Sequence, residues 1–356
     1  MPDTPDIQVH HLAKRYGETV AVRDVSFEVP RGEIFGFLGP NGAGKSTTVQ
    51  ILTTLALPSD GSAEVGGFDV VRQPAEVRRV SGVALQEIGL DPMMTARQLL
   101  RLHAGLFGFG RRDAAKRAEE LLEIVGLTAD ADRKAGQYSG GMRRRLDLAM
   151  ALVHEPRILF LDEPTTGLDP ASRRDVWAEV RRLNREKGMT IFLTTQYLEE
   201  ADVLAERIAI IDHGTVVREG TPEGLKAAMG EESLEVAFID AATAERAATV
   251  LADLDGFPRA PRSDGATLRL YTDHAAQRVA KVATALTNAG LEPTSLTLAR
   301  PTLDDVFLAA TGQRFDASPA DAVPADAASP DSVPSESPRD DGDATDPDAT
   351  SHGRAA

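Results

Sequence analysis

Short apolar runs alternate with longer stretches of helical periodicity over the first two-thirds of the chain. The apolar runs are rich in β-branched residues and predict strands at Ala21–Val29, Glu33–Leu38, Val80–Leu85, Ile158–Asp162, Met189–Thr194 and Arg207–Asp212. Helical spacing between them predicts helices at Thr95–Phe107, Arg112–Val125 and Ala171–Lys187, the last closed by Gly188. Strands that alternate with helices pair in parallel, so this part is predicted to be an α/β fold.

The pattern changes after a Gly-Thr-Pro turn at residues 220–222 and a short helix. The elements predicted from here on are a strand at Leu234–Ile239, a helix at Ala241–Leu254, strands at Thr267–Tyr271 and Thr294–Ala299 flanking a helix at Ala275–Ala289, and a final helix near Thr302–Ala310. This order favours a small α+β domain of ferredoxin-like shape. We therefore expect a first domain over residues 1–230 and an accessory domain over residues 231–315.

The last 41 residues, 316–356, have a third composition, with ten acidic residues, two Arg, six Pro and no aromatic residue. A segment with so little apolar surface cannot offset the entropy of ordering, so we predict a disordered acidic tail. An acidic interaction segment is the alternative interpretation.

Charge and cysteine content exclude several classes of protein. The 356 residues carry a net charge of −16, which argues against a nucleic-acid-binding protein and against direct insertion into anionic lipid. The chain has no Cys, which excludes disulfides and thiolate chemistry and suits a reducing cytoplasm. We see neither a secretory signal nor an apolar run long enough to span a membrane, so any membrane attachment is expected to run through a protein partner.

The most specific motif lies between a predicted strand and a predicted helix. It matches G-x-x-x-x-G-K-[ST] and consists of Gly39, Pro40, Asn41, Gly42, Ala43, Gly44, Lys45 and Ser46, followed by Thr47. Glycines let backbone N–H groups turn toward a phosphate, Lys45 would reach the β- and γ-phosphates, and Ser46 would bind Mg²⁺. A merely Gly-rich turn is the alternative.

A second motif is the apolar run Ile158–Leu161, which ends in two carboxylates, Asp162 and Glu163. Because ligands bind at the carboxyl ends of parallel strands, Asp162 would meet Mg²⁺, and Glu163 would polarise a water against the γ-phosphate. Acidic residues also follow strands as helix caps, which is the structural alternative.

A third motif, Ser139, Gly140 and Gly141, precedes a helical pattern and predicts a second phosphate site. Two such sites in one chain are explained if they hold one nucleotide from opposite sides of a dimer. The three arginines at 143–145 are expected to form a solvated helix face rather than to bind phosphate directly.

Together these motifs resemble the nucleotide-binding subunit of ABC transporters over residues 7–230. The resemblance implies a P-loop NTPase fold with a helical subdomain, and ATP and Mg²⁺ as substrate and metal. It implies that Tyr16 stacks on adenine, that Gln86 contacts Mg²⁺ or the attacking water, and that Asp169 crosses a dimer interface. Ser139, Gly140 and Gly141 would grip the γ-phosphate bound by the other subunit.

Two positions depart from that family's common pattern: Met142 stands where Gln is usual and Gln196 where His is usual. Gln196 can donate a hydrogen bond to phosphate but cannot take a proton, so hydrolysis is slowed if the family's His must be charged and tolerated if it only positions. The strings around both residues, and Leu303–Leu308, resemble exporter ATPases of the daunorubicin/doxorubicin-resistance type.

The resemblance implies an ATP-hydrolysing, homodimeric subunit, peripheral at the cytoplasmic face of the cell membrane. It would drive efflux of a hydrophobic, antibiotic-like compound through a separate polytopic permease. The accessory domain resembles one implicated in assembly with that permease. The segment after Gln86 resembles the helical subdomain that contacts the permease; Met93 and Met94 are its candidates for the docking surface, and ordinary core packing is the alternative. The alternatives are a soluble ABC-type ATPase of translation or DNA repair, and an exporter of lipid or polysaccharide.

Overall fold

The computed structural model describes residues 4–86, 89–229, 232–252, 254–257, 260–272, 275–299 and 301–312. The acidic tail predicted for residues 316–356 lies outside the described residues. Among the residues described, no helix has the length and apolarity needed to cross a bilayer.

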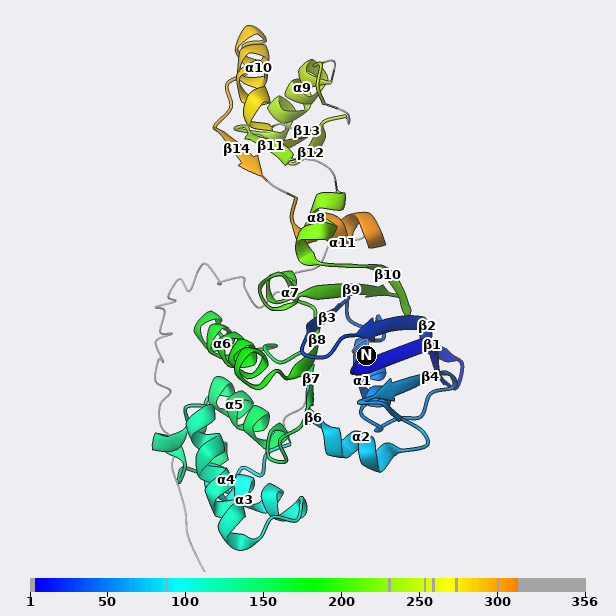
Figure 1. The fold of residues 1–356 in the computed structure, drawn as a ribbon. Helices are drawn as coiled ribbons and strands as arrows, with labels where there is room; N and C mark the ends of the chain where they lie inside the picture. Colours follow the sequence, from blue (N-terminus) through cyan, green and yellow to red (C-terminus); the bar gives the residue numbers. More distant parts are fainter. Residues whose placement is uncertain are drawn as a thin grey trace, which may run out of the picture. The chain divides into compact units, whose positions relative to one another are not determined.

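The first domain is built on a ten-stranded sheet in the order β5-β4-β1-β2-β10-β9-β3-β8-β7-β6 (Figure 1). Its parallel strands are β3 (Ile34–Leu38), β6 (Ser81–Ala84), β7 (Ile158–Asp162), β8 (Thr190–Thr195) and β9 (Arg207–Asp212). The remaining strands are β1 (Ile7–Tyr16), β2 (Thr19–Val29), β4 (Asp60–Val65), β5 (Phe68–Asp69) and β10 (Thr215–Gly220), each with an antiparallel partner, which for β10 is β9. The predicted α/β fold is confirmed.

Helices cover both faces of the parallel strands (Figure 1). On one face lie α3 (Ala96–Leu106), α4 (Arg111–Ile124), α5 (Gly140–Ala151), α6 (Pro170–Lys187) and α7 (Leu198–Leu204), of which α3 and α4 form a helical subdomain packed on α5. On the other lie α1 (Lys45–Leu52), α2 (Pro74–Val80) and the antiparallel strands. Because both faces are buried, the parallel strands are mainly apolar, and their apolar runs could be recognised in the sequence.

Side-chain alternation divides each parallel strand between two cores. Phe35, Phe37, Phe160 and Phe192 point to the α1 face and join Phe27 in a cluster whose ring centroids lie 5.3 to 5.8 Å apart. Aliphatic side chains of the same strands, such as Ile191 and Leu193, pack under α5 and α6. The parallel strands therefore have little freedom to slip, since a shift of one residue would exchange the two cores.

The helix ends follow local chemistry that was visible in the sequence. Thr95 caps α3 in a capping box with Gln98, and Gly188, with φ of 62°, ends α6 in the left-handed conformation. The bounds predicted for β7 and β9 are confirmed. Strands β4, β5 and β10 escaped prediction because they are short, mostly exposed or only half-buried, and lack a continuous apolar run.

A second sheet follows, in the order β12-β13-β11-β14 with every pairing antiparallel. Its elements are β11 (Glu232–Ala237), α9 (Ala241–Leu251), β12 (Arg262–Asp264), β13 (Thr267–Thr272), α10 (Ala275–Asn288) and β14 (Ser295–Ala299). The succession β-α-β-β-α-β is that of the split βαβ unit. Leu234, Val236, Leu268 and Leu270 contribute to its own core with residues of α9 and α10.

The last described helix, α11 (Leu303–Thr311), packs differently from the grouping made on sequence. Its buried residues Leu303, Val306 and Phe307 lie in one cluster with Leu38 of β3 and residues of α7, β9 and α8 (Pro222–Ala228). The chain thus returns to the first domain after β14. The apolar spacing of a helix shows that one face is buried but not which element covers it.

Candidate functional site

The loop between β3 and α1 requires glycine at positions where other backbone comes close. A Cβ on Gly39 would lie 2.5 Å from the carbonyl oxygen of Ile211, and one on Gly44 would lie 2.6 Å from that of Ala21. Gly44 also has φ of 107°, a conformation that other residues rarely adopt. The tight turn aims the amino end of α1 at the carboxyl edge of the sheet.

Lys45, the first residue of α1, is buried at the mouth of this loop. Its Nζ donates hydrogen bonds to the carbonyl oxygens of Gly39 at 2.8 Å and Pro40 at 3.1 Å. It also forms an ion pair with Glu163 Oε1 at 3.2 Å, and both side chains are about 5% exposed. The ammonium group is therefore held in place by the loop and by the carboxylate that follows β7.

Ser46 and Asp162 are 116 residues apart in sequence, yet their side-chain oxygens, both possible metal ligands, lie side by side. Ser46 Oγ donates to Asp162 Oδ1 at 3.2 Å, and Thr194 Oγ1 donates to the same oxygen at 2.5 Å. Within the described residues, no group of three His, Cys, Asp or Glu could hold a metal. A hydroxyl with one carboxylate nevertheless fits Mg²⁺, which commonly takes one or two protein ligands beside water and substrate phosphates.

Glu163 sits in a strained turn directly after β7. Its φ is 49°, and such a left-handed conformation costs about 1–3 kcal/mol for a residue other than glycine. Its N–H donates to the carbonyl and the hydroxyl of Thr194, each at 3.1 Å. Its Oε2 accepts hydrogen bonds from Gln86 Nε2 and Thr166 Oγ1, each at 3.3 Å. Surrounding contacts therefore fix both the backbone and the carboxylate.

A cavity of about 610 Å³ brings nine of the predicted site residues together. It is lined by Thr19, Val20, Ala21, Asn41, Gly42, Gly44, Lys45, Ser46, Thr47, Gln86, Glu163, Thr166 and Gln196. This volume lies in the range of small-molecule sites. Thr166 and Thr194 escaped sequence analysis, although both lie within a few residues of predicted site residues, because an isolated Thr carries no motif.

Tyr16 is one of the predicted site residues that do not line the cavity; the others are Gly39, Pro40, Ala43, Asp162, Asp169 and the three residues Ser139–Gly141. Tyr16 ends β1, is 47% exposed, and has the ammonium of Lys14 4.7 Å from its ring centroid. The neighbouring Thr19, Val20 and Ala21 do line the cavity. Stacking of Tyr16 on adenine stays a prediction.

The signature segment, Ser139–Gly141, forms the amino end of α5 and lies apart from the lining of this cavity. Ser139 is exposed, and its hydroxyl accepts the N–H of Met142 at 3.2 Å. A Cβ on Gly141 would meet Ser172 Oγ at 2.6 Å, so glycine is needed for α5 to pack against the start of α6. Gly140 is half-buried beside it.

Asp169 caps α6 next to the signature segment. Its Oδ1 accepts the N–H groups of Ala171 and Ser172, each at 3.0 Å. The hydroxyl of Ser172 donates to its Oδ2, and this bond, with the backbone bonds, holds the pKa of Asp169 below its usual value. The carboxylate is exposed and its geometry is fixed.

The arginines at 143–145 do not share one environment. Arg143 is exposed and Arg145 is half-buried, but Arg144 is 4% exposed and hydrogen-bonds inside the first domain. The predicted solvated face is therefore wrong for Arg144. Helical periodicity alone could not show this, because the sequence gives the same residue type for a buried arginine as for an exposed one.

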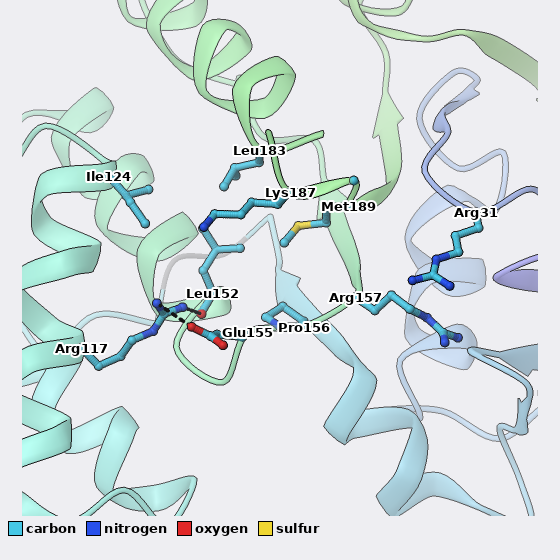
Figure 2. Close-up of a pocket in the computed structure, with 11 residues that line it drawn as sticks. Arg31, Arg117, Ile124, Leu152, Glu155, Pro156, Arg157, Leu183, Lys187 and Met189 are labelled. Carbon is cyan, nitrogen blue, oxygen red and sulfur yellow. Dashed lines mark hydrogen bonds and ion pairs between the residues drawn. The ribbon is translucent and has the colours of Figure 1, made fainter. Parts of the chain in front are cut away.

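A second hollow, of about 300 Å³, lies at the opposite edge of the sheet (Figure 2). Its lining includes Arg31, Arg157 and Met189, which precede the amino ends of β3, β7 and β8, and the ion pair of Arg117 with Glu155 at 3.1 Å. Parallel α/β sheets bind ligands at their carboxyl ends. The cavity around Lys45, and not this one, is therefore the candidate active site.

Comparison with known proteins agrees with this geometry. The family model described as ABC transporter matches residues 22–166. The chain is 46% identical over 315 residues to a daunorubicin resistance ATP-binding protein of Streptomyces coeruleorubidus, covering 88% of this chain and 97% of that protein. It is 44% identical over 313 residues to the daunorubicin/doxorubicin resistance ATP-binding protein of Streptomyces peucetius, covering 88% and 94%.

Among solved structures, the chain is similar to a dimeric ATP-binding cassette in a post-hydrolysis state bound to ADP and Pi. The TM-score is 0.55 at 28% identity, and the match covers 60% of this chain and 98% of that one.

Proposed function

The chain belongs to the ATP-binding subunits of ABC transporters, of the daunorubicin/doxorubicin-resistance type, and we propose that it hydrolyses ATP in the cavity around Lys45 to drive export of a hydrophobic compound. The observation that carries the proposal is the meeting of Lys45, Ser46, Asp162 and Glu163 at the carboxyl edge of the sheet. These four side chains bring together a cation that can bind phosphate, two ligands for a metal ion and a general base.

Phosphate binding would change the partners of Lys45. Its ammonium group already makes three contacts, to Gly39, Pro40 and Glu163. A γ-phosphate that takes a donor from Lys45 therefore competes with the Glu163 carboxylate and releases it. Ser46 and Asp162 would hold Mg²⁺, which when bound neutralises charge on the β- and γ-phosphate oxygens.

The released carboxylate is placed to act as general base. Glu163 Oε2 and Gln86 Nε2 lie 3.3 Å apart in a direct hydrogen bond, so a water that accepts from Gln86 and donates to Glu163 would replace this bond once the carboxylate is released. Gln196 lines the same cavity and would donate its amide N–H to a phosphate oxygen without exchanging a proton. In this role Gln196 only positions the phosphate.

The exposed start of the signature segment supports action as a homodimer. Ser139 offers a capped helix amino end to solvent, and it lies outside the lining of the chain's own cavity. In the proposal, Ser139, Gly140 and Gly141 contact the nucleotide of a second copy, with Asp169 at the same interface. The dimeric form of the similar cassette agrees with this arrangement.

The helical subdomain offers a surface for a permease. Met93, Leu102, Leu106 and Phe107 are between 46% and 75% exposed, and all lie in or beside α3. Met94 packs partly into the core beneath them. We propose that a polytopic membrane protein docks here and holds the subunit, as a peripheral protein, at the cytoplasmic face of the membrane.

The proposal is tested by gentle affinity purification from membranes of the native host, with wild type beside Glu163→Gln. A polytopic protein that co-purifies in stoichiometric amount and survives a salt wash is the expected result, with an antibiotic-like compound accumulating when the wild-type gene is deleted. Recovery with ribosomes or nucleic acid would instead assign a soluble ATPase. Accumulation of a lipid or polysaccharide would change only the proposed identity of the cargo and would leave the exporter assignment in place.

A further inference from the structure

Arg144 is buried one turn into α5, and its guanidinium reaches three main-chain carbonyls in segments distant in sequence. Nε donates to Pro164 O at 2.9 Å, Nη2 to Asp162 O at 3.1 Å and Nη1 to Leu85 O at 2.5 Å. Nη1 also meets the carboxylate of Asp147 at 3.0 Å. Four of its five N–H groups are thereby used in a planar, fixed geometry.

These carbonyls bracket the two side chains that face the reacting water in the proposed mechanism. Asp162 and Pro164 are the residues on either side of Glu163, whose own φ is 49°. Leu85 directly precedes Gln86. A non-glycine residue stays in the left-handed region only where its surroundings determine its conformation, and Arg144 supplies that constraint on both flanks of Glu163.

Burying this cation is not what stability alone would select. Loss of solvent lowers the pKa of Arg144, and burial raises the pKa of its partner Asp147 to about 6. Apolar residues of similar volume are commonly as stable as, or more stable than, a buried ion pair. The arrangement instead gives directional contacts to specific carbonyls, as expected of a group that sets geometry.

The position of Arg144 on α5 connects it to the signature segment. It lies five residues after Ser139, about 7.5 Å along the helix axis at 1.5 Å per residue. A helix of this length moves as a unit over such a distance. When the amino end of α5 moves onto a phosphate, Arg144 therefore moves with it, and its guanidinium shifts the turn that holds Glu163.

We propose that Arg144 is a positioning residue that sets Glu163 and Gln86 for hydrolysis and couples them, through α5, to the nucleotide that Ser139–Gly141 grip in the partner subunit. This inference rests on the proposed dimeric ATPase and adds its coupling element. It makes hydrolysis at the two sites cooperative, because each α5 contacts one nucleotide at its end and the catalytic turn of the other site one turn later.

The test compares Arg144→Gln with Arg145→Gln in the full-length chain. Arg145 lies on the same helix, is half-buried, and donates to Val125 O at 3.1 Å, away from the Glu163 turn, so its variant matches the loss of charge. For Arg144→Gln we expect kcat to fall at least tenfold, MgATP affinity to stay within about threefold, and the Hill coefficient for ATP to fall toward one. Arg145→Gln should leave all three near wild type.

Arg144→Lys keeps the charge but can reach fewer of the carbonyls, so its kcat should lie between those of wild type and Arg144→Gln. If Arg144→Gln does not fold, the same comparison is made with Arg144→Lys. If MgATP affinity falls about as many-fold as kcat and the melting temperature also falls, Arg144 has a merely structural role and the inference is overturned. Equal behaviour of the Arg144 and Arg145 variants would also overturn it.

Adding Arg144→Gln to Glu163→Gln separates this inference from the proposed function. Because most of the loss in Arg144→Gln is expected to come from misplacement of Glu163, the double variant should hydrolyse ATP less than tenfold more slowly than Glu163→Gln alone. A further tenfold loss would overturn the inference while the ATPase assignment stands. Full activity of Glu163→Gln itself would instead contradict the proposed role of Glu163.

Discussion

The amino ends of α1 and α5 both present glycines at a helix start, yet only the first is complete within one chain. Around α1, Lys45 is 4% exposed and is met by Glu163, with Ser46 and Asp162 beside it. Around α5, Ser139 is exposed and its hydroxyl caps its own helix.

The glycines of the two ends also serve different needs. Gly39 and Gly44 make room for backbone oxygens that close the loop, whereas Gly141 makes room for Ser172 at the start of α6. The first set shapes a binding cavity, and the second sets the packing of a helix whose end remains open. In the proposed mechanism, α1 carries a whole phosphate site and α5 carries half of one.

The largest effect is expected at the base of the α1 site. Glu163→Gln keeps the volume and the hydrogen-bond acceptor but removes the base, so kcat for ATP should fall about 10³-fold while MgATP binding persists. Phosphate release and nucleotide binding measured on the same preparation check this. Glu155→Gln, an exposed carboxylate of the opposite edge, serves as control. Turnover above a tenth of wild type would remove Glu163 from this role.

Loss of the cation at α1 should weaken binding itself. Lys45→Ala removes the phosphate contact and leaves the buried Glu163 without its ion-pair partner, so ATP affinity should fall by about 10²-fold or more. Calorimetric titration measures the affinity. Lys187→Ala, an exposed lysine lining the second hollow, should bind normally. Undiminished affinity in Lys45→Ala would contradict the assignment of the cavity.

A negative charge at the amino end of α5 should slow turnover without altering the chain's own cavity. Ser139→Glu retains a helix-capping oxygen but repels the γ-phosphate of a partner, so kcat should fall about tenfold or more while ATP still binds. Mixed with Lys45→Ala, which is inactive alone, it forms dimers with one unaltered composite site, and measurable ATPase activity should return. Mixtures no more active than either variant would show that α5 does not act in trans.

The smallest effect is expected on the free energy of unfolding, at the start of β3, the strand that leads into α1. Burial raises the pKa of Glu33, which precedes β3, to about 7 from its usual 4.5, against the opposing charge of Arg207 at 3.2 Å. Its stabilising contribution is thus fully present below pH 4.5 and is lost as the pH rises through 7.

The free energy of unfolding should therefore fall by about 1–3 kcal/mol between pH 5 and 8, and by less in Glu33→Gln. Denaturant titrations followed by the fluorescence of Trp177, the single tryptophan, measure both slopes. Identical slopes in the two proteins would contradict the raised pKa.

Prediction from sequence succeeded where local chemistry and burial agree. β7 and β9 are continuous apolar runs buried on both faces, and the loop at 39–46 combines glycines and Lys45 at fixed spacing. It failed for β10, whose mostly half-buried residues show no regular alternation, and for Arg144, whose burial depends on packing between α5 and the end of β7.

By itself the sequence determined the α/β class, the glycine-rich loop before α1, the two carboxylates after β7 and a second glycine-containing helix start at α5. Each of these depends on residue types within a few positions of one another. Tertiary structure alone decided that α11 packs with the first domain, that Lys45 pairs with Glu163, and that Arg144 reaches the turn around Glu163. Such contacts join segments tens of residues apart, and only the folded packing of whole elements brings them within bonding distance.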